Sequence, residues 1–253
     1  MPFVSLFLLY KVLLAIEVIL KKECYNDERA IKKGNSLMLK KVIKEAFPTV
    51  LAFTMSGMYS IVDGIFVGKA AGDTGLAAIN IAWPIPALIT ALGIGIGTGG
   101  SVLYSHYRGR GEQKVCENLF ELTMTLLIGT GILATILLSL VQKPFLEILG
   151  AAGSVQTEAI KYTAIIIAGS ILQVAGTGIM PLLRNMNQSL GAMLSMAAGF
   201  AVNILVNYYL MFRLNMGIKG AAFGTVTAQA VVVMAGCAIL WKTGYRKWRL
   251  LWH

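Results

Sequence analysis

Six long apolar runs constrain this chain more than any other feature of its sequence. Each run is long enough to cross a hydrocarbon core of about 30 Å, which takes roughly 17 to 25 helical residues. The runs lack the period-two alternation of barrel strands, and 57% of the chain is apolar against 13% charged. The sequence therefore predicts an all-α membrane protein, a bundle of six transmembrane helices at approximately 46–67, 76–104, 119–141, 160–182, 191–212 and 218–241.

The basic residues predict which side of the membrane each loop occupies. With the N-terminus inside, nine Lys and Arg precede the first span, three lie in 105–118, one in 183–190 and four after Trp241. The outer segments hold only Lys69, Lys143, Lys161, Arg213 and Lys219. Because Lys and Arg gather on the cytoplasmic side, both termini are predicted to be cytoplasmic, in a multi-pass protein of the plasma membrane. No aromatic residues interleave the basic clusters to stack on bases, so nucleic acid is not an expected partner.

The apolar runs also divide the chain into three parts. Residues 1–45 are predicted to form a basic cytoplasmic extension, 46–241 the membrane lobe and 242–253 a basic cytoplasmic tail. Within 1–20, Lys11 and Glu17 lie about 240° apart on a helix, which disfavours a seventh span, and no basic n-region marks a signal peptide. Two interpretations of residues 1–20 remain, namely an interfacial helix or an upstream extension of the reading frame. Residues 21–45 are expected to be a solvated linker.

Several kinds of chemistry lack the residues they need. The three cysteines and two histidines occur singly, without the spacing of a disulfide or a metal site. The stretch Gly95–Gly100 matches the dinucleotide pattern G-x-G-x-x-G, but it lies within an apolar run and follows no strand. No pair of acids, histidine or nucleophile set shares one depth in the membrane. Neither an enzyme, nor a metal site, nor a bound cofactor is therefore expected.

The second apolar run has an unusual content of glycine and proline. Gly93 with Gly97, and Gly95 with Gly99, are i, i+4 pairs that would let another helix approach the backbone closely. At its start, Pro84 and Pro86 remove backbone donors and are expected to kink or delay the helix. A helix in a protein that moves and a helix in a tightly packed static bundle both fit this composition.

One carboxylate, Asp63, lies near the end of the first apolar run. The rise of 1.5 Å per residue places Asp63, Asn207 and Thr225 about 7 to 10 Å outside the bilayer midplane, with Asn203 one turn below Asn207. An acid facing lipid costs at least about 2.5 kcal/mol, so Asp63 should face the bundle interior and these neutral groups. This pattern fits two interpretations: a site that binds a cation or a proton, and a structural hydrogen-bond cluster.

A series of short motifs in these spans resembles the multidrug and toxic compound extrusion (MATE) family of transporters. The likeness covers about residues 38–245, and its motifs are Tyr59–Gly68, Ala91–Gly97, Arg108–Glu112, Leu149–Ala151, Ala159–Tyr162 and Gly217–Ala222. It implies a secondary antiporter that expels cationic or amphipathic drugs as H+ or Na+ moves inward. The implied fold has twelve helices in two six-helix lobes.

The resemblance also implies functional residues in the first lobe. Asp63, Asn203 and Thr225 match the family's cation-site acid, asparagine and threonine, but Asn207 stands where the family commonly has a second aspartate. This reduces the charge available to hold Na+. Further candidates, for lining a substrate cavity, are Tyr59, Trp83, Gln173 and Gln229.

The chain contains only one such lobe, whereas transporters built from repeats move one repeat against the other. Three hypotheses follow: a truncated or frameshifted product, one half of a split transporter, or a homodimer. The expected partners are the lipid bilayer, small-molecule drugs and a second six-helix lobe or second copy. A flippase for lipid-linked substrates and a non-transporting regulatory partner are the alternatives from other functional classes.

Overall fold

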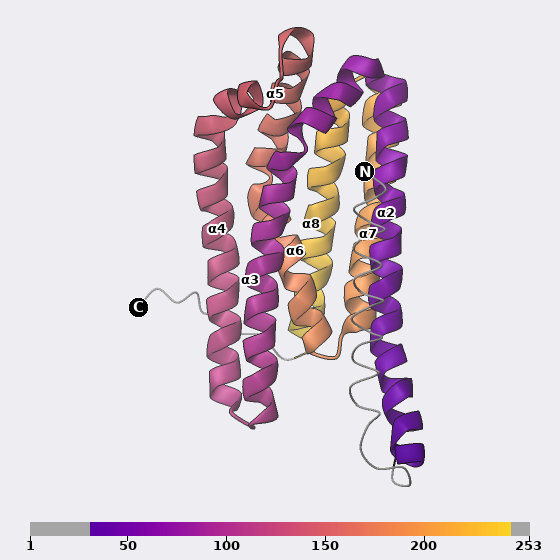
Figure 1. Ribbon diagram of the computed structural model, residues 1–253, viewed down its shortest axis with the longest axis vertical. Helices are drawn as coiled ribbons and strands as arrows, with labels where there is room; N and C mark the ends of the chain where they lie inside the picture. Colours follow the sequence, from indigo (N-terminus) through magenta and orange to yellow (C-terminus); the bar gives the residue numbers. More distant parts are fainter. Residues whose placement is uncertain (1–30, 244–253) are drawn as a thin grey trace.

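The computed structural model describes residues 31–243, and within that range the chain folds into helices with no strand (Figure 1). The predicted interfacial helix in 1–20 and most of the basic tail lie outside the described residues. In chain order the helices are α2 (Ile31–Ala82), α3 (Pro84–Gly109), α4 (Gln113–Ile148), α5 (Gly153–Ala168), α6 (Ser170–Asn185), α7 (Ser189–Tyr208), the π-helical turn η1 (Tyr209–Arg213) and α8 (Ile218–Lys242). The all-α prediction is confirmed for the described chain.

The number of spans also agrees with the sequence. Five helical segments in the described chain are long and apolar enough to cross a membrane, namely Ala46–Ala82, Pro84–Gly109, Gln113–Ile148, Ser189–Arg213 and Ile218–Lys242. The pair α5–α6 is bent by 59°, and it makes a sixth span if the two helices are taken together. The apolar runs thus located every spanning segment, but they did not reveal that the fourth one is broken.

Three breaks give these helices their paths. In α2, Gly72 leaves the helical conformation with a φ of 64°, so the helix turns at one end of the bundle before α3 begins (Figure 1). The chain breaks again at Trp83, and Pro84 starts α3 at the position where a missing backbone donor costs nothing, as the prolines predict. The third break, at Gly169, separates α5 from α6, where Val226 of α8 fills the space a side chain would need.

The predicted boundary at residue 45 is not a boundary of secondary structure. Helix α2 begins at Ile31 and continues through residue 45 into the membrane segment without interruption. The part of the predicted linker from residue 31 onward is therefore helical. A long apolar helix propagates readily into flanking residues because each added residue gains a backbone hydrogen bond.

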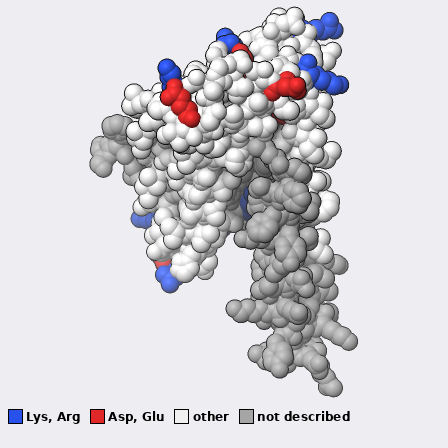
Figure 2. Space-filling model, turned by 45° about the horizontal axis from the view of Figure 1, so that its top comes forward, with Lys and Arg blue, Asp and Glu red and all other residues white. Residues whose placement is uncertain are grey.

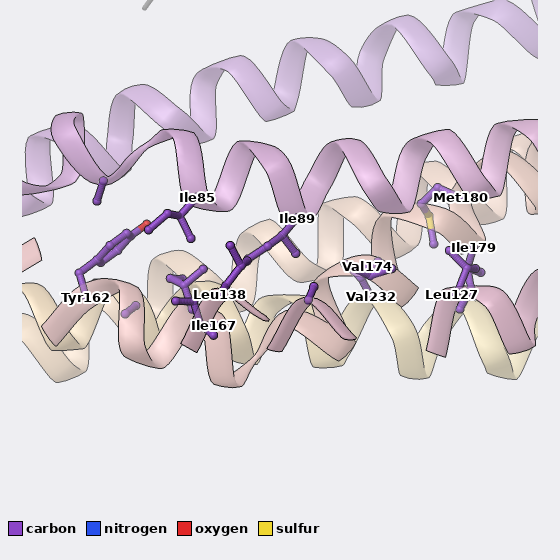
Figure 3. Close-up of a cluster of buried hydrophobic side chains, with 14 of the residues drawn as sticks. Ile85, Ile89, Leu127, Leu138, Tyr162, Ile167, Val174, Ile179, Met180 and Val232 are labelled. Atoms are coloured by element: carbon purple, nitrogen blue, oxygen red, sulfur yellow. The ribbon is translucent and has the colours of Figure 1, made fainter. Parts of the chain in front are cut away.

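Buried side chains from all seven α-helices of the described chain form a core along the bundle, and Figure 3 shows part of it. Helix α3 packs most extensively against α6 and α4, whereas α7 packs most extensively against α8 and α2. Helix α5 lies against α2, α4 and α8, and so connects the two groups. The core residues labelled in Figure 3 are Ile85, Ile89, Leu127, Leu138, Tyr162, Ile167, Val174, Ile179, Met180 and Val232.

Only one of the two predicted glycine pairs in α3 lies at a helix interface. A Cβ at Gly93 would overlap Thr177 of α6, and one at Gly97 would overlap the backbone of Gly178. Gly95 and Gly99 have no neighbour within 4 Å among the described residues, so no helix of this part of the chain packs against them. Residues two apart lie about 200° apart around a helix, so the two pairs could not both face α6.

Charged side chains are distributed as expected for a membrane bundle. On the face shown in Figure 2, most Lys, Arg, Asp and Glu side chains gather near the ends of the molecule, with a broad uncharged band between. Large apolar side chains are exposed on this bundle, among them Ile61, Leu133 and Leu205. An exposed apolar band between charged ends is suited to lipid rather than to water.

Candidate cation site between helices α2, α7 and α8

Asp63 lies in the spanning part of α2 and faces α7. Its carboxylate oxygen Oδ1 accepts a hydrogen bond of 2.7 Å from the side-chain amide nitrogen of Asn207. The same nitrogen donates a second bond, of 2.9 Å, to Oδ1 of Asn203, one turn earlier on α7. Asn203 and Asn207 are both buried, whereas Asp63 is partly exposed. The acid is therefore held from one side and remains accessible from the other.

Tyr59, one turn before Asp63 on α2, extends this network to α8. Its hydroxyl lies 3.2 Å from Oγ1 of Thr225 and accepts a bond of 3.4 Å from the amide nitrogen of Asn203. The Tyr59 ring stacks on Phe200 of α7, with ring centroids 5.3 Å apart and planes 10° apart. A continuous chain of hydrogen bonds thus links Thr225, Tyr59, Asn203, Asn207 and Asp63 across three helices.

The other end of the Asn207 amide is unusual. Its oxygen Oδ1 is buried and is the one buried side-chain polar atom without a hydrogen-bond partner in the described chain. This oxygen lies against Gly224 of α8, where a Cβ would overlap it. Glycine at 224 therefore lets α8 approach α7 closely over the amide.

The sequence placed four polar residues at similar depth in the membrane, and the structure brings these four residues together. Asp63, Asn203 and Asn207 bond directly, and Thr225 joins them through Tyr59. Sequence reasoning placed Tyr59 in a substrate cavity and did not find its linking role. It also missed Tyr162 of α5, a buried residue that interacts electrostatically with Asp63. A single tyrosine near the end of a span is typical of the membrane interface, so its sequence position gave no specific signal.

The other three predicted cavity residues do not join the network. Gln173 of α6 donates hydrogen bonds to Thr90 Oγ1 at 2.8 Å and to the carbonyl of Pro86 at 3.2 Å, and so ties α6 to α3. Gln229 lies one turn after Thr225 on α8, but its side-chain oxygen packs against Gly176 of α6. Trp83 is 46% exposed at the break between α2 and α3. The two glutamines therefore serve helix packing in this structure.

The chemical groups at the site restrict what it can bind. Among the side chains that the structure describes, no group of three or more His, Cys, Asp or Glu gathers. The network contributes one carboxylate and several neutral oxygens. By residue type alone, the set contains a group that takes up a proton and oxygens of the kind that bind a small hard cation.

Comparison with known proteins gives a consistent result. The MatE family model matches residues 48–209. Multidrug export protein MepA of Staphylococcus haemolyticus (strain JCSC1435) is 22% identical over 211 residues, which is 81% of this chain and 45% of that protein. MepA of Staphylococcus aureus (strain NCTC 8325 / PS 47) is 22% identical over 212 residues, 82% of this chain and 46% of that protein.

Solved structures have the same helical arrangement. A structure described as "Crystal structure of MATE in the bent conformation" matches with a TM-score of 0.74 and 25% identity, over 81% of this chain and 45% of that one. One described as "Outward-facing conformation of a multidrug resistance MATE family transporter of the MOP superfamily" gives a TM-score of 0.72 at 24% identity, with the same coverage. The chain thus spans about half the length of the proteins it matches.

Proposed function

Because the chain belongs to the MatE family, we propose that it is a six-helix unit of a secondary transporter that expels cationic or amphipathic compounds as H+ or Na+ moves inward. The observation that carries this proposal is a partly exposed carboxylate, Asp63, within a spanning helix and bonded by Asn207. The MepA relatives are named multidrug export proteins, which supports the substrate class.

A structural role alone does not account well for the acid. An asparagine at position 63 could also join a hydrogen-bond network, without the cost of about 2.5 kcal/mol or more that an ionised acid pays at membrane depth. Within residues 31–243 the carboxylate receives a single hydrogen bond, so much of its bonding capacity is free. A group that is charged, accessible and only partly bonded is suited to bind and release a cation during a transport cycle.

The test compares Asp63→Asn with the parent in proteoliposomes that also contain a second six-helix unit, such as the remaining half of S. aureus MepA. Efflux of a cationic dye is measured under an imposed pH gradient and, separately, an imposed Na+ gradient. Asp63→Asn is expected to abolish ion-driven efflux at equal protein content, because the neutral amide does not take up a proton and removes the negative charge that would attract a cation. Asp73→Asn, on the exposed part of the same helix beyond Gly72, is the matched control and should retain efflux. Equal efflux by Asp63→Asn and the parent would reduce Asp63 to a structural role.

A second candidate function is the movement of an anionic, lipid-linked substrate, and one observation favours it. The guanidinium of Arg184, in the last turn of α6, lies 5.3 Å from the ring centroid of Phe53 and 3.5 Å from the sulfur of Met196. The one ion pair found in the described chain joins Lys161 and Glu158, so Arg184 has no acidic partner there. Arginine suits phosphate groups well. In the dye assay Arg184→Gln should retain efflux if the first proposal holds.

A further inference from the structure

The family resemblance leaves both H+ and Na+ as coupling ions, and the network itself allows a choice between them. A hard cation such as Na+ must be surrounded by several oxygen atoms with free lone pairs. The Asp63 carboxylate oxygen and the Asn203 side-chain oxygen both bond to Asn207 of α7, so these are the oxygens that a cation at this position would bridge. Whether Na+ fits depends on what already lies between these oxygens.

A nitrogen lies there. The Asn207 amide nitrogen is 2.7 Å from Oδ1 of Asp63 and 2.9 Å from Oδ1 of Asn203, so both of its hydrogens point at the two oxygens that a bridging cation would need. The amide oxygen of Asn207, which could have been a third ligand, points the opposite way, toward Gly224. A neutral donor therefore occupies the position of the cation.

The surroundings hold the amide in this orientation. A half-turn of the amide would place its NH2 group against Gly224, where the buried oxygen now lies without a partner. In that orientation the bonds to Asp63 and Asn203 would be lost, and the Asn207 oxygen would face the oxygens of both residues. Losing two hydrogen bonds and bringing three oxygen atoms together is costly, so the present orientation is favoured.

The charged and titratable groups around Asp63 do not supply the negative charge that a Na+ site would need. Two tyrosines interact with Asp63, namely Tyr59 on its own helix and Tyr162 on α5. From α7 and α8 the network receives only the neutral side chains of Asn203, Asn207 and Thr225. Asp63 is thus the single carboxylate of the network, and a site for Na+ lacks both the charge and the open oxygens.

We propose that Asn207 excludes Na+ from this site, because its amide nitrogen fills the space between the oxygens of Asp63 and Asn203. This inference rests on the proposed function and narrows it, since H+ is then the ion left to drive transport. Asn207 acts as a specificity-determining residue. It contributes a donor where a carboxylate would contribute a ligand.

The experiment measures Na+ binding without transport, on the purified chain in detergent. Thermal unfolding is followed in NaCl and in KCl at equal ionic strength. The parent should give the same Tm in both salts. Asn207→Asp replaces the donor by two acceptors, so its Tm should rise in NaCl alone, by roughly 3 to 6 °C for each tenfold increase in Na+ above the Kd. Asn207→Ser removes the NH2 group and keeps an oxygen, so its Tm should show a smaller increase in NaCl. This variant replaces Asn207→Asp in the test if the aspartate variant does not fold.

Each result separates the hypotheses. A Na+-specific rise in the Tm of the parent would overturn the inference. The inference would also be overturned if Na+ changed the Tm of neither the parent nor the folded variants, because Asn207 would then not be the cause of Na+ exclusion. Failure of the proposed function would look different. Asp63→Asn and the parent would then show equal efflux, while the Tm responses to Na+ stayed as expected here.

Discussion

At the scale of single residues, Gly224 tests how tightly the network is built. Gly224→Ala adds a Cβ that overlaps the Asn207 amide oxygen, so the amide or α8 must move. Overpacking of this kind typically costs about 1–3 kcal/mol. We expect a lower Tm for the purified protein. Gly64→Ala, next to Asp63, has no neighbour within 4 Å and should leave the Tm unchanged or higher. Equal Tm values for the two variants would show that the contact at Gly224 is not tight.

The same residues show what the sequence can and cannot predict about a site in a membrane. Depth is predictable, because helix rise and alternating direction fix the level of Asp63, Asn203, Asn207 and Thr225. The bonds among them are not, because they depend on the rotation of each helix about its axis. Tyr59 illustrates this limit: its ring position is set by stacking on Phe200, and only then does its hydroxyl reach Thr225.

At the scale of helices, the glycines of α3 give a matched pair of substitutions. A Cβ at Gly97 overlaps the backbone of Gly178, which cannot rotate away as a side chain can, so Gly97→Ala must push α3 and α6 apart. We expect a loss of about 1–3 kcal/mol or more in unfolding free energy. Gly99→Ala has open space and should be neutral or slightly stabilising. Thermal unfolding of both variants beside the parent measures the difference. If Gly99→Ala were the more damaging change, α3 would have to face α6 differently.

Helix breaks follow a similar division between what is predictable and what is not. The break at Trp83 could be predicted, because Pro84 and Pro86 remove backbone donors whatever their surroundings. The turn at Gly72 falls between the first two predicted spans, 46–67 and 76–104, and so could be predicted, whereas the break at Gly169, inside the fourth apolar run, could not be predicted. Gly95 and Gly99 are also glycines within apolar runs, yet they remain helical. An isolated glycine permits a break without requiring one, and at Gly169 the break is accompanied by the close contact of Val226.

At the scale of the whole molecule, the orientation in the membrane remains a prediction that labelling can test. Lys69 and Lys143 are exposed in segments expected to face outward, and Lys114 is exposed in the first turn of α4, in a segment expected to face inward. Cysteines placed at Lys69 or Lys143 should react with an impermeant thiol reagent in intact cells, because Lys and Arg favour the cytoplasmic side elsewhere in the chain. Lys114→Cys is the control and should react only after the membrane is opened. The reverse pattern would invert the topology.

The same scale raises the question of what covers Asp63. The carboxylate is partly exposed at membrane depth, and Met58 and Ile61 nearby on α2 are both 62% exposed. Facing an acid to lipid costs at least about 2.5 kcal/mol, so a second six-helix unit should cover this side and enclose a water-filled path. We therefore expect that the chain alone, shown to be monomeric in liposomes by single-molecule photobleaching, does not drive dye efflux under a pH gradient. Addition of a second unit should restore efflux, and a fused dimer of this chain tests whether a second copy suffices. Ion-driven efflux by the verified monomer would contradict this prediction, because Asp63 would then complete its cycle without a facing unit.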